Sequence, residues 1–188
     1  MDYTIRAIRA DEWEKTRAIR LDALRDPAAG IAFLDTYEAA VGRPESFWRE
    51  RAEGSAEESG RARQFVAEAP DGSWVGTATV LVERPSDETR FGAPAKVDQT
   101  HVVGVYVRPG ARGTGLTERL FQGCVEWSWG LSEPVVRRVR LYVHQDNARA
   151  AAFYRRFGFV ATGERVPVPG DASTYECEYE IRRPAARA

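Results

Sequence analysis

The chain has 188 residues, a formal net charge of −1 and only two cysteines. This length is typical of one domain with a substantial core, so we expect residues 1–188 to form a single domain. The balanced charge argues against nucleic acid as a partner, and two cysteines and two histidines, widely spaced, predict neither a disulfide framework nor a metal site.

The first half of the chain begins without the basic region and apolar core of a signal peptide. No apolar run has the length of a membrane span, so we expect a cytoplasmic protein with no membrane partner. Asp11 is a suitable N-cap for a helix that ends near Pro27, and a second helical region at 36–52 is expected to break near Pro44. Strands are predicted at residues 3–9, 64–69 and 74–82.

The second half begins with residues 84–98, which are rich in charge and proline and show no periodicity. A connection of this length is often functional. Beyond it, strands are predicted at residues 100–107, 135–143, 159–166 and 174–181, with helices at 114–131 and 147–157. Gly158 suits a left-handed end of the last helix.

This order of elements predicts an α/β (α+β) fold. Hairpins dominate the first half, and a helical crossover joins the fourth expected strand to the fifth. We therefore expect a mixed, mostly antiparallel sheet of about seven strands flanked by about four helices.

The stretch with the clearest chemistry is residues 105–117, a strand followed by a glycine-rich turn and the start of a helix. Gly113 and Gly115 let an anion approach the backbone closely, and the N–H groups at the helix start have no partner within the helix. Arg112 adds positive charge, so the turn predicts a phosphate or pyrophosphate site. Neither the dinucleotide-binding fingerprint nor the P-loop pattern is present, and a glycine turn without a ligand is the plain alternative.

Two motifs in this half resemble the GCN5-related N-acetyltransferase (GNAT) family. The first is Arg112-x-x-Gly115-x-Thr117, which is similar to the pyrophosphate loop of that family, with Thr117 in place of the usual glycine or alanine. The second runs from Val143 through Asn147, Ala150, Phe153 and Tyr154 to Phe159 and is similar to the second signature segment. Both occur in the order and at the separation typical of the family, and the resemblance covers nearly all of residues 3–182.

The resemblance implies that the fourth and fifth strands splay apart and that acetyl-CoA, the co-substrate, lies in the gap. Backbone groups of the fourth strand would pair with its pantetheine arm, the glycine loop would hold its pyrophosphate, and Asn147 would bond the pantetheine region. The cofactor-binding residues implied in this way are Val105, Tyr106, Val107, Arg112, Gly113, Thr114, Gly115, Leu116, Thr117, Asn147 and Tyr154.

The resemblance also implies a direct transfer of the acetyl group to a primary amine in a ternary complex. Tyr154 would protonate the departing thiolate, although a packed helix aromatic is the plain alternative for this residue. His101 aligns with a position that often holds a glutamate base, and its pKa range suits that role; a hydrogen-bonded strand histidine is equally open. Glu83 is the alternative base, and we interpret His144 as structural.

The acceptor is a small-molecule amine or an amine of a peptide or protein, and the sequence does not separate these. Aromatic and acidic side chains would suit a cationic amine with an apolar body, although core packing explains most of them equally well. The candidates are Phe33, Asp35, Tyr37, Trp48, Glu83 and Tyr175. A catalytically silent acyl-CoA sensor of the same fold is the alternative function, and a homodimer is an open assembly.

Overall fold

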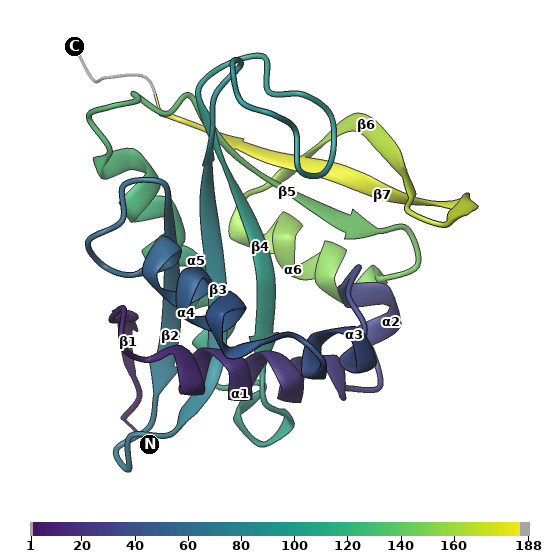
Figure 1. Cartoon of the computed structure of the whole chain (residues 1–188). Helices are drawn as coiled ribbons and strands as arrows, with labels where there is room; N and C mark the ends of the chain where they lie inside the picture. Colours follow the sequence, from purple (N-terminus) through teal and green to yellow (C-terminus); the bar gives the residue numbers. More distant parts are fainter. Residues whose placement is uncertain (1, 185–188) are drawn as a thin grey trace.

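A seven-stranded sheet in the order β1-β2-β3-β4-β5-β7-β6 runs through the computed structural model, which describes residues 2–184 (Figure 1). Its strands are β1 Thr4–Ala7, β2 Ala62–Glu68, β3 Trp74–Glu83, β4 Gln99–Val107, β5 Arg138–His144, β6 Val160–Val168 and β7 Asp171–Arg182. Neighbouring strands are antiparallel, except that β4 and β5 run parallel. The predicted mixed, mostly antiparallel sheet is confirmed.

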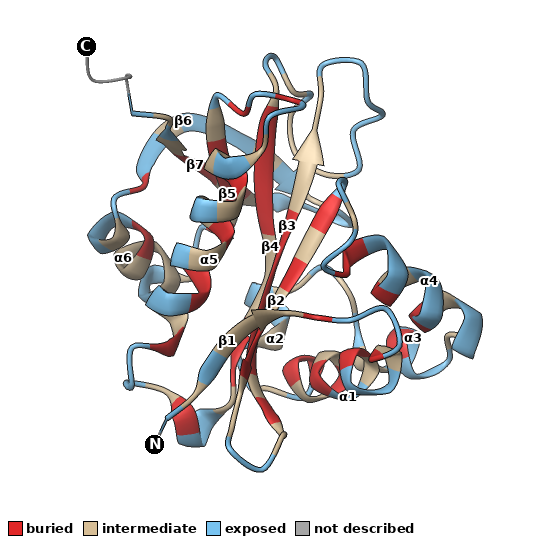
Figure 2. Cartoon of the chain, turned by 90° about the vertical axis from the view of Figure 1, so that its left-hand side faces the viewer, coloured by how far each residue is buried: buried red, intermediate tan, exposed pale blue. Residues whose placement is uncertain are grey.

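Six α-helices accompany the sheet, rather than about four. They are α1 Trp13–Leu24, α2 Ala29–Ala32, α3 Tyr37–Val41, α4 Glu45–Ser55, α5 Leu116–Gly130 and α6 Ala148–Phe157, with a 3-10 turn, η1, at Pro109–Ala111. The two additional helices are short: α2 has 4 residues and α3 has 5. Helices α1, α3 and α4 lie on one side of the sheet, and α5 and α6 lie on the other (Figure 2).

The break predicted near Pro44 separates α3 from α4. Thr36 caps α3 by accepting a hydrogen bond from the Ala39 N–H at 3.2 Å, and Gly42 ends the helix. Pro44 precedes α4 in an extended conformation, with φ of −68° and ψ of 161°. Because proline restricts the residue before it to extended backbone, one continuous helix does not form here.

Alternation along the strands divides the apolar side chains between the two layers of helices. On the α5 side, Val80 and Val102 of the sheet pack against Leu120 and Phe121, and all four are buried. On the α1 side, Ile8 and Val66 pack with Ile19 in a second cluster. Burial on both faces makes the sheet the rigid platform from which the site residues project.

The two parallel strands, β4 and β5, pair over a short stretch and then diverge. They pair at Gln99–Arg138, Thr100–Val139 and His101–Arg140 and at no later residue of the described chain. Further along, β4 carries a bulge opposite β3, with Gly104 at a φ of +63°. A bulge bends its strand locally, and the divergence matches the splay that the resemblance implies.

Candidate active site

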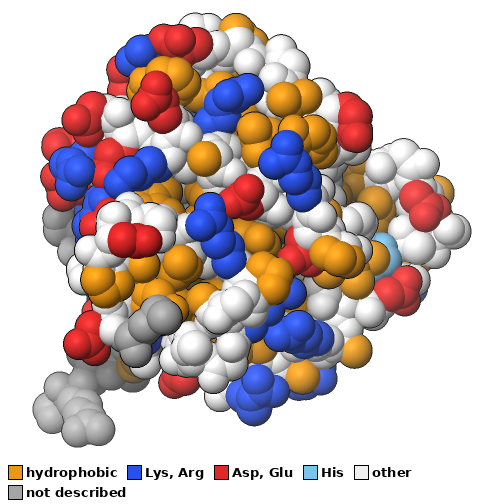
Figure 3. All heavy atoms as spheres, turned by 90° about the horizontal axis from the view of Figure 1, so that it is seen from below, with side chains coloured by type: hydrophobic (Ala, Val, Ile, Leu, Met, Phe, Trp, Pro, Cys, Tyr) orange, Lys and Arg blue, Asp and Glu red, His pale blue; other side chains and the backbone are white. Residues whose placement is uncertain are grey.

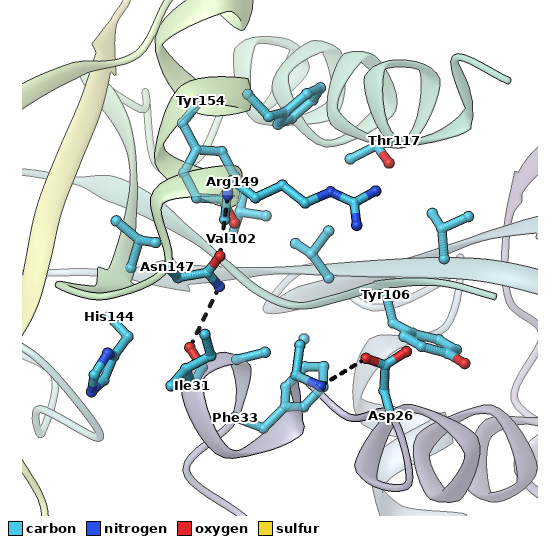
Figure 4. A pocket seen from close by; sticks show the side chains of 18 of the residues that line it. Asp26, Ile31, Phe33, Val102, Tyr106, Thr117, His144, Asn147, Arg149 and Tyr154 are labelled. Atoms are coloured by element: carbon cyan, nitrogen blue, oxygen red, sulfur yellow. Dashed lines mark hydrogen bonds between the residues drawn. The ribbon is translucent and has the colours of Figure 1, made fainter. Parts of the chain in front are cut away.

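A cavity of about 480 Å³ opens where β4 and β5 diverge (Figure 4). Residues 102–107 of β4 line one side of this central cavity, α6 and the end of β5 line the other, and α2 lies across it. Most of the residues that the resemblance implies for acetyl-CoA line it: Val105, Tyr106, Val107, Arg112, Gly113, Gly115, Thr117, Asn147 and Tyr154. Thr114 and Leu116 do not, since the Thr114 hydroxyl donates to the Ala111 carbonyl and Leu116 is a core residue.

The glycine loop fits an anion. Gly113 and Gly115 have φ values of +78° and +81°, and a Cβ at either position would meet no atom within 4 Å. The first backbone bond of the helical type is donated by the Arg119 N–H to the Gly115 carbonyl, at 3.1 Å. The N–H groups of the first turn of α5 are therefore free for a ligand, and the space beside the glycines is open.

Arg112 holds this loop in place through its side chain. Its Nε donates to the Val107 carbonyl at 2.9 Å, and its guanidinium pairs with Asp26 at the end of α1. Burial disfavours the Asp26 carboxylate, but the Ala28 N–H and Arg112 hold its pKa below the ordinary value. The guanidinium thus braces the loop against α1, while its backbone faces the cavity.

Two further arginines of α6 line the central cavity and were missed by the sequence analysis. They are Arg149 and Arg156, both exposed, and Arg149 extends across the cavity (Figure 4). Their only signal in the sequence was their spacing on a helix beside a phosphate-type loop. Seen from below, the surface carries Lys and Arg side chains among hydrophobic and acidic ones (Figure 3).

Helix α6 is anchored at both ends. Asn147 caps it, as predicted, by accepting a hydrogen bond from the Ala150 N–H at 3.1 Å, and its amide also donates to the Ile31 carbonyl of α2 at 3.5 Å. Gly158 ends the helix at a φ of +116°, which is also as predicted. These contacts fix the helix that carries Tyr154.

A model of the acetyltransferase (GNAT) family matches residues 16–159 of this chain. The chain belongs to the GNAT family. A mycothiol acetyltransferase from Saccharomonospora viridis is 38% identical over 95 residues, which make up 50% of this chain and 29% of that protein. The matched stretch thus spans less than a third of that relative.

Solved structures of GNAT proteins share the fold along nearly the whole chain. Arabidopsis thaliana NAA60 in complex with a bisubstrate analogue has a TM-score of 0.67 at 18% identity, covering 96% of this chain and 98% of that one. A GNAT acetyltransferase from Streptococcus pneumoniae has a TM-score of 0.66 at 17% identity, covering 97% and 100%.

In this GNAT chain, Tyr154 is 9% exposed and lines the central cavity. Its ring packs against Phe121 and Phe159, with centroids 5.5 and 6.2 Å apart. Burial raises the pKa of the phenol, and the negative charge of Glu176 raises it further. The hydroxyl therefore holds its proton firmly at neutral pH.

His101 lies in a buried polar network and does not line the cavity. Its side chain is 3% exposed, and its Nδ1 lies 2.8 Å from Glu83 Oε1. The other Glu83 oxygen accepts from Gln99 at 2.7 Å and from Arg140 at 2.8 Å. Burial disfavours the Glu83 carboxylate, but these donors, His101 first, hold its pKa below the ordinary value. This geometry argues against either side chain as the base.

Only one of the predicted acceptor residues, Phe33, lines the central cavity, and Arg20 stacks on its ring at 4.7 Å. Asp35 pairs with Arg43 at 3.1 Å. Trp48 is 1% exposed in the core, which corrects the expectation that it faces an acceptor. The aromatic rings of the remaining two, Tyr37 and Tyr175, stack on arginines Arg25 and Arg165.

Glu176 of β7 was also missed by the sequence analysis. It is 9% exposed and lines the central cavity. Burial raises its pKa from an ordinary 4.5 to about 7. Its signal was the spacing of three glutamates along the last predicted strand, which places them on one face.

Some kinds of site find no support in the part of the chain that the structure describes. Within residues 2–184, no group of three His, Cys, Asp or Glu side chains is arranged to hold a metal ion. In the same range, no helix combines the length and apolar character that a membrane span requires. Cys124 and Cys177 are both free thiols, and the first is buried.

Proposed function

We propose that this GNAT protein is an acetyl-CoA-dependent N-acetyltransferase that acts on a primary amine by direct transfer in a ternary complex. The observation that carries the proposal is one continuous cavity that joins an open glycine loop to a buried tyrosine. Gly113 and Gly115 lie at one end of it, and Tyr154 lines it between β4 and β5. A phosphate-type loop and a proton donor in one cavity suit acyl transfer from a nucleotide thioester.

The residues of the cavity fit acetyl-CoA. The N–H groups at the start of α5 would hold the pyrophosphate, supported by Arg149 and Arg156, which have no ion pair within residues 2–184. Val105 and Val107 offer backbone groups beyond the last β4–β5 pair, so an extended pantetheine arm has a strand edge to bond. NAA60 of Arabidopsis thaliana, a structural neighbour, was crystallised with acetyl-CoA.

When bound, acetyl-CoA supplies the thioester carbon that the acceptor amine attacks. Tyr154 holds a proton at its Oη for the sulfur that departs, and its buried ring excludes water from that point. Helix α2, which is tied to α6 by the hydrogen bond between Asn147 and Ile31, lies across the cavity. The positioning of both substrates in one cavity supplies most of the remaining rate enhancement.

A thiol-release assay with acetyl-CoA and a panel of amines tests the proposal. We expect turnover with at least one of phenethylamine, spermidine and a tripeptide with a free N-terminus. Gly115→Val should weaken CoA binding by at least about tenfold in calorimetry, because a Cβ at positive φ strains the loop and fills the open space. The matched control is Gly54→Ala, far from the loop and with no atom near a new Cβ.

The rival function is a silent acyl-CoA sensor of the same fold. A sensor needs the loop and the cavity, but it has no use for a buried phenol whose proton faces the ligand. Tight CoA binding without thiol release on any amine, peptide or polyamine would favour the sensor. If neither Gly115→Val nor Arg112→Ala weakens CoA binding, both functions are overturned.

A further inference from the structure

Three glutamates alternate along β7 and therefore share one face of the sheet: Glu176, Glu178 and Glu180. Two of them are paired with arginines. Glu178 contacts Arg138 at 3.0 Å and Arg140 at 3.1 Å. Glu180 contacts Arg138 at 2.8 Å and Arg182 at 2.6 Å. Burial opposes both carboxylates, but the arginines hold their pKa values below the ordinary range.

Glu176 is buried like its two neighbours but has no ion-pair partner within residues 2–184. It is 9% exposed, against 2% for Glu178 and 5% for Glu180. No side chain within residues 2–184 makes an ion pair with it, and its cross-strand neighbours are His144 on β5 and Val166 on β6. A buried carboxylate without a cation is costly, so a site that retains one at a cavity wall is adapted to a cation from outside.

The ionisable groups around Glu176 leave it as the proton acceptor. Opposite it on β5, the His144 Nδ1 accepts the Asp146 N–H at 3.2 Å, so this nitrogen is occupied by the backbone. From α6, Tyr154 presents a neutral phenol. On its own strand Tyr175 is stacked on Arg165 of β6, at 4.5 Å, and Glu178 is neutralised by its arginines.

We propose that Glu176 binds the ammonium group of the acceptor and takes its proton before acyl transfer, so that the acceptor is a cationic primary amine. This assignment rests on the proposed acetyltransferase function and names the base and the charge class of its acceptor. It replaces His101 and Glu83, whose side chains bond each other and do not line the cavity.

The protons balance without any further reactant. Glu176 takes one proton from the ammonium, and the freed nitrogen forms its bond to the acyl carbon as the C–S bond breaks. Tyr154 gives its proton to the sulfur and regains one from the nitrogen, which becomes a neutral amide. Glu176 then releases its proton to solvent, so one proton is produced for each amide formed.

The same proton transfer prepares the acid. The Glu176 carboxylate contributes to the raised pKa of Tyr154, after burial itself. Protonation of Glu176 removes that negative charge, so the phenol becomes a stronger acid once the amine has been deprotonated. The base and the acid are thus coupled in the order in which the reaction uses them.

The first test is kinetic and uses Glu176→Gln, which keeps the shape and removes the proton acceptor. With the best acceptor of the amine panel, we expect kcat/KM at pH 7 to fall ~10²-fold. In the pH profile of kcat/KM, the limb that rises through about pH 7 and reports on the free enzyme should disappear. The affinity for CoA in calorimetry should stay unchanged. Glu164→Gln, an exposed residue of β6, is the matched control and should keep both the rate and the limb.

The second test needs no turnover and separates this inference from the proposed function. Carboxyl ¹³C NMR of the whole protein should show Glu176 titrating near pH 7, and phenethylamine should lower that midpoint because its ammonium favours the carboxylate. If phenethylamine moves the midpoint but no thiol is released, Glu176 still binds an ammonium group and the acetyltransferase function is overturned. An unmoved midpoint, or a kinetic limb that survives in Glu176→Gln, would overturn the role of Glu176.

Discussion

The acidic face of β7 has two ends that share one residue type and differ in what surrounds it. At one end, Glu178 and Glu180 are bound by arginines. At the other, Glu176 faces the central cavity beside Tyr154 and has no cation within residues 2–184. Since all three glutamates lie on one strand and are buried, the arginines account for the difference. Paired carboxylates hold strands together, whereas an unpaired one at a cavity wall is available for chemistry.

The largest expected effect comes from breaking the paired end. Arg140 is 1% exposed at its side chain and binds both Glu83 and Glu178, at 2.7 and 3.1 Å. Arg140→Met removes the one buried cation that bridges these two carboxylates, so we expect a loss of about 3–5 kcal/mol in unfolding free energy. Urea unfolding at pH 7 measures it.

The control for this loss is Arg182→Ala. The Arg182 side chain is 80% exposed and contacts Glu180 at the same end of the face. Because Arg182 is exposed and Glu180 keeps Arg138 as a partner, the control should stay within about 1 kcal/mol of wild type. Equal stability of Arg140→Met and wild type would show that the paired end is not structural.

The next effect concerns the acid at the cavity end. Tyr154→Phe keeps the ring among Phe121 and Phe159 and removes only the hydroxyl. We expect kcat to fall ~10²-fold with little change in acetyl-CoA affinity, as is typical when general acid catalysis is lost. Tyr179→Phe is the control, because that hydroxyl contacts Arg155 at 3.1 Å outside the cavity. Similar losses in both variants would point to packing rather than acid catalysis.

Features of the site that depend on residues close together in the chain could be predicted from the sequence. Contacts between residues far apart in the chain could not. The glycine turn and the Asn147 cap depend on residues close together in the chain, so their patterns were readable. The arginine pairs were not, because Arg112 meets Asp26 across 86 positions and Arg138 meets Glu178 across 40. His101 aligned with a base position, but only the network around Glu83 shows that its ring is already occupied.

The fold follows the same division. Periodicity predicted the strands and the long helices, whereas the 4-residue α2 and the bulge at Gly104 have too few residues to produce a pattern. Both features shape the central cavity, one by covering it and the other by bending β4 away from β5. The site therefore depends on the parts of the fold that a single sequence reveals least.

A third prediction compares the two ends through the pH dependence of stability. The pKa of Glu176 is raised in the folded protein, so its contribution to stability is lost as pH rises from about 4.5 to about 7. Glu176→Gln should therefore be more stable than wild type by about 1–3 kcal/mol at pH 8 and equal to it at pH 4. Unfolding by urea across this range measures the difference.

Glu180→Gln should change the stability at pH 8 in the opposite direction. The pKa of Glu180 is lowered by Arg138 and Arg182 against the effect of burial, so its stabilisation is present at neutral pH and lost in acid. This variant should be less stable than wild type at pH 8. If both variants change stability in the same direction at pH 8, the two ends of the face do not differ as described.

The smallest effect should come from giving the cavity end the partner that it lacks. His144 is the cross-strand neighbour of Glu176, so His144→Arg places a guanidinium on the strand beside that carboxylate. The new guanidinium should lower the pKa of Glu176 by about one unit, and the limb of kcat/KM should move to lower pH by the same amount. The KM for a cationic amine should also rise, because the arginine competes for the carboxylate.

Asp146, whose carboxylate lies 3.8 Å from the His144 ring, would compete for the new arginine, so the variant is also made with Asp146→Asn. His144→Gln supplies the uncharged control and should leave the limb near its wild-type position. A limb that stays in place in the arginine variant with Asp146→Asn would show that Glu176 does not set it.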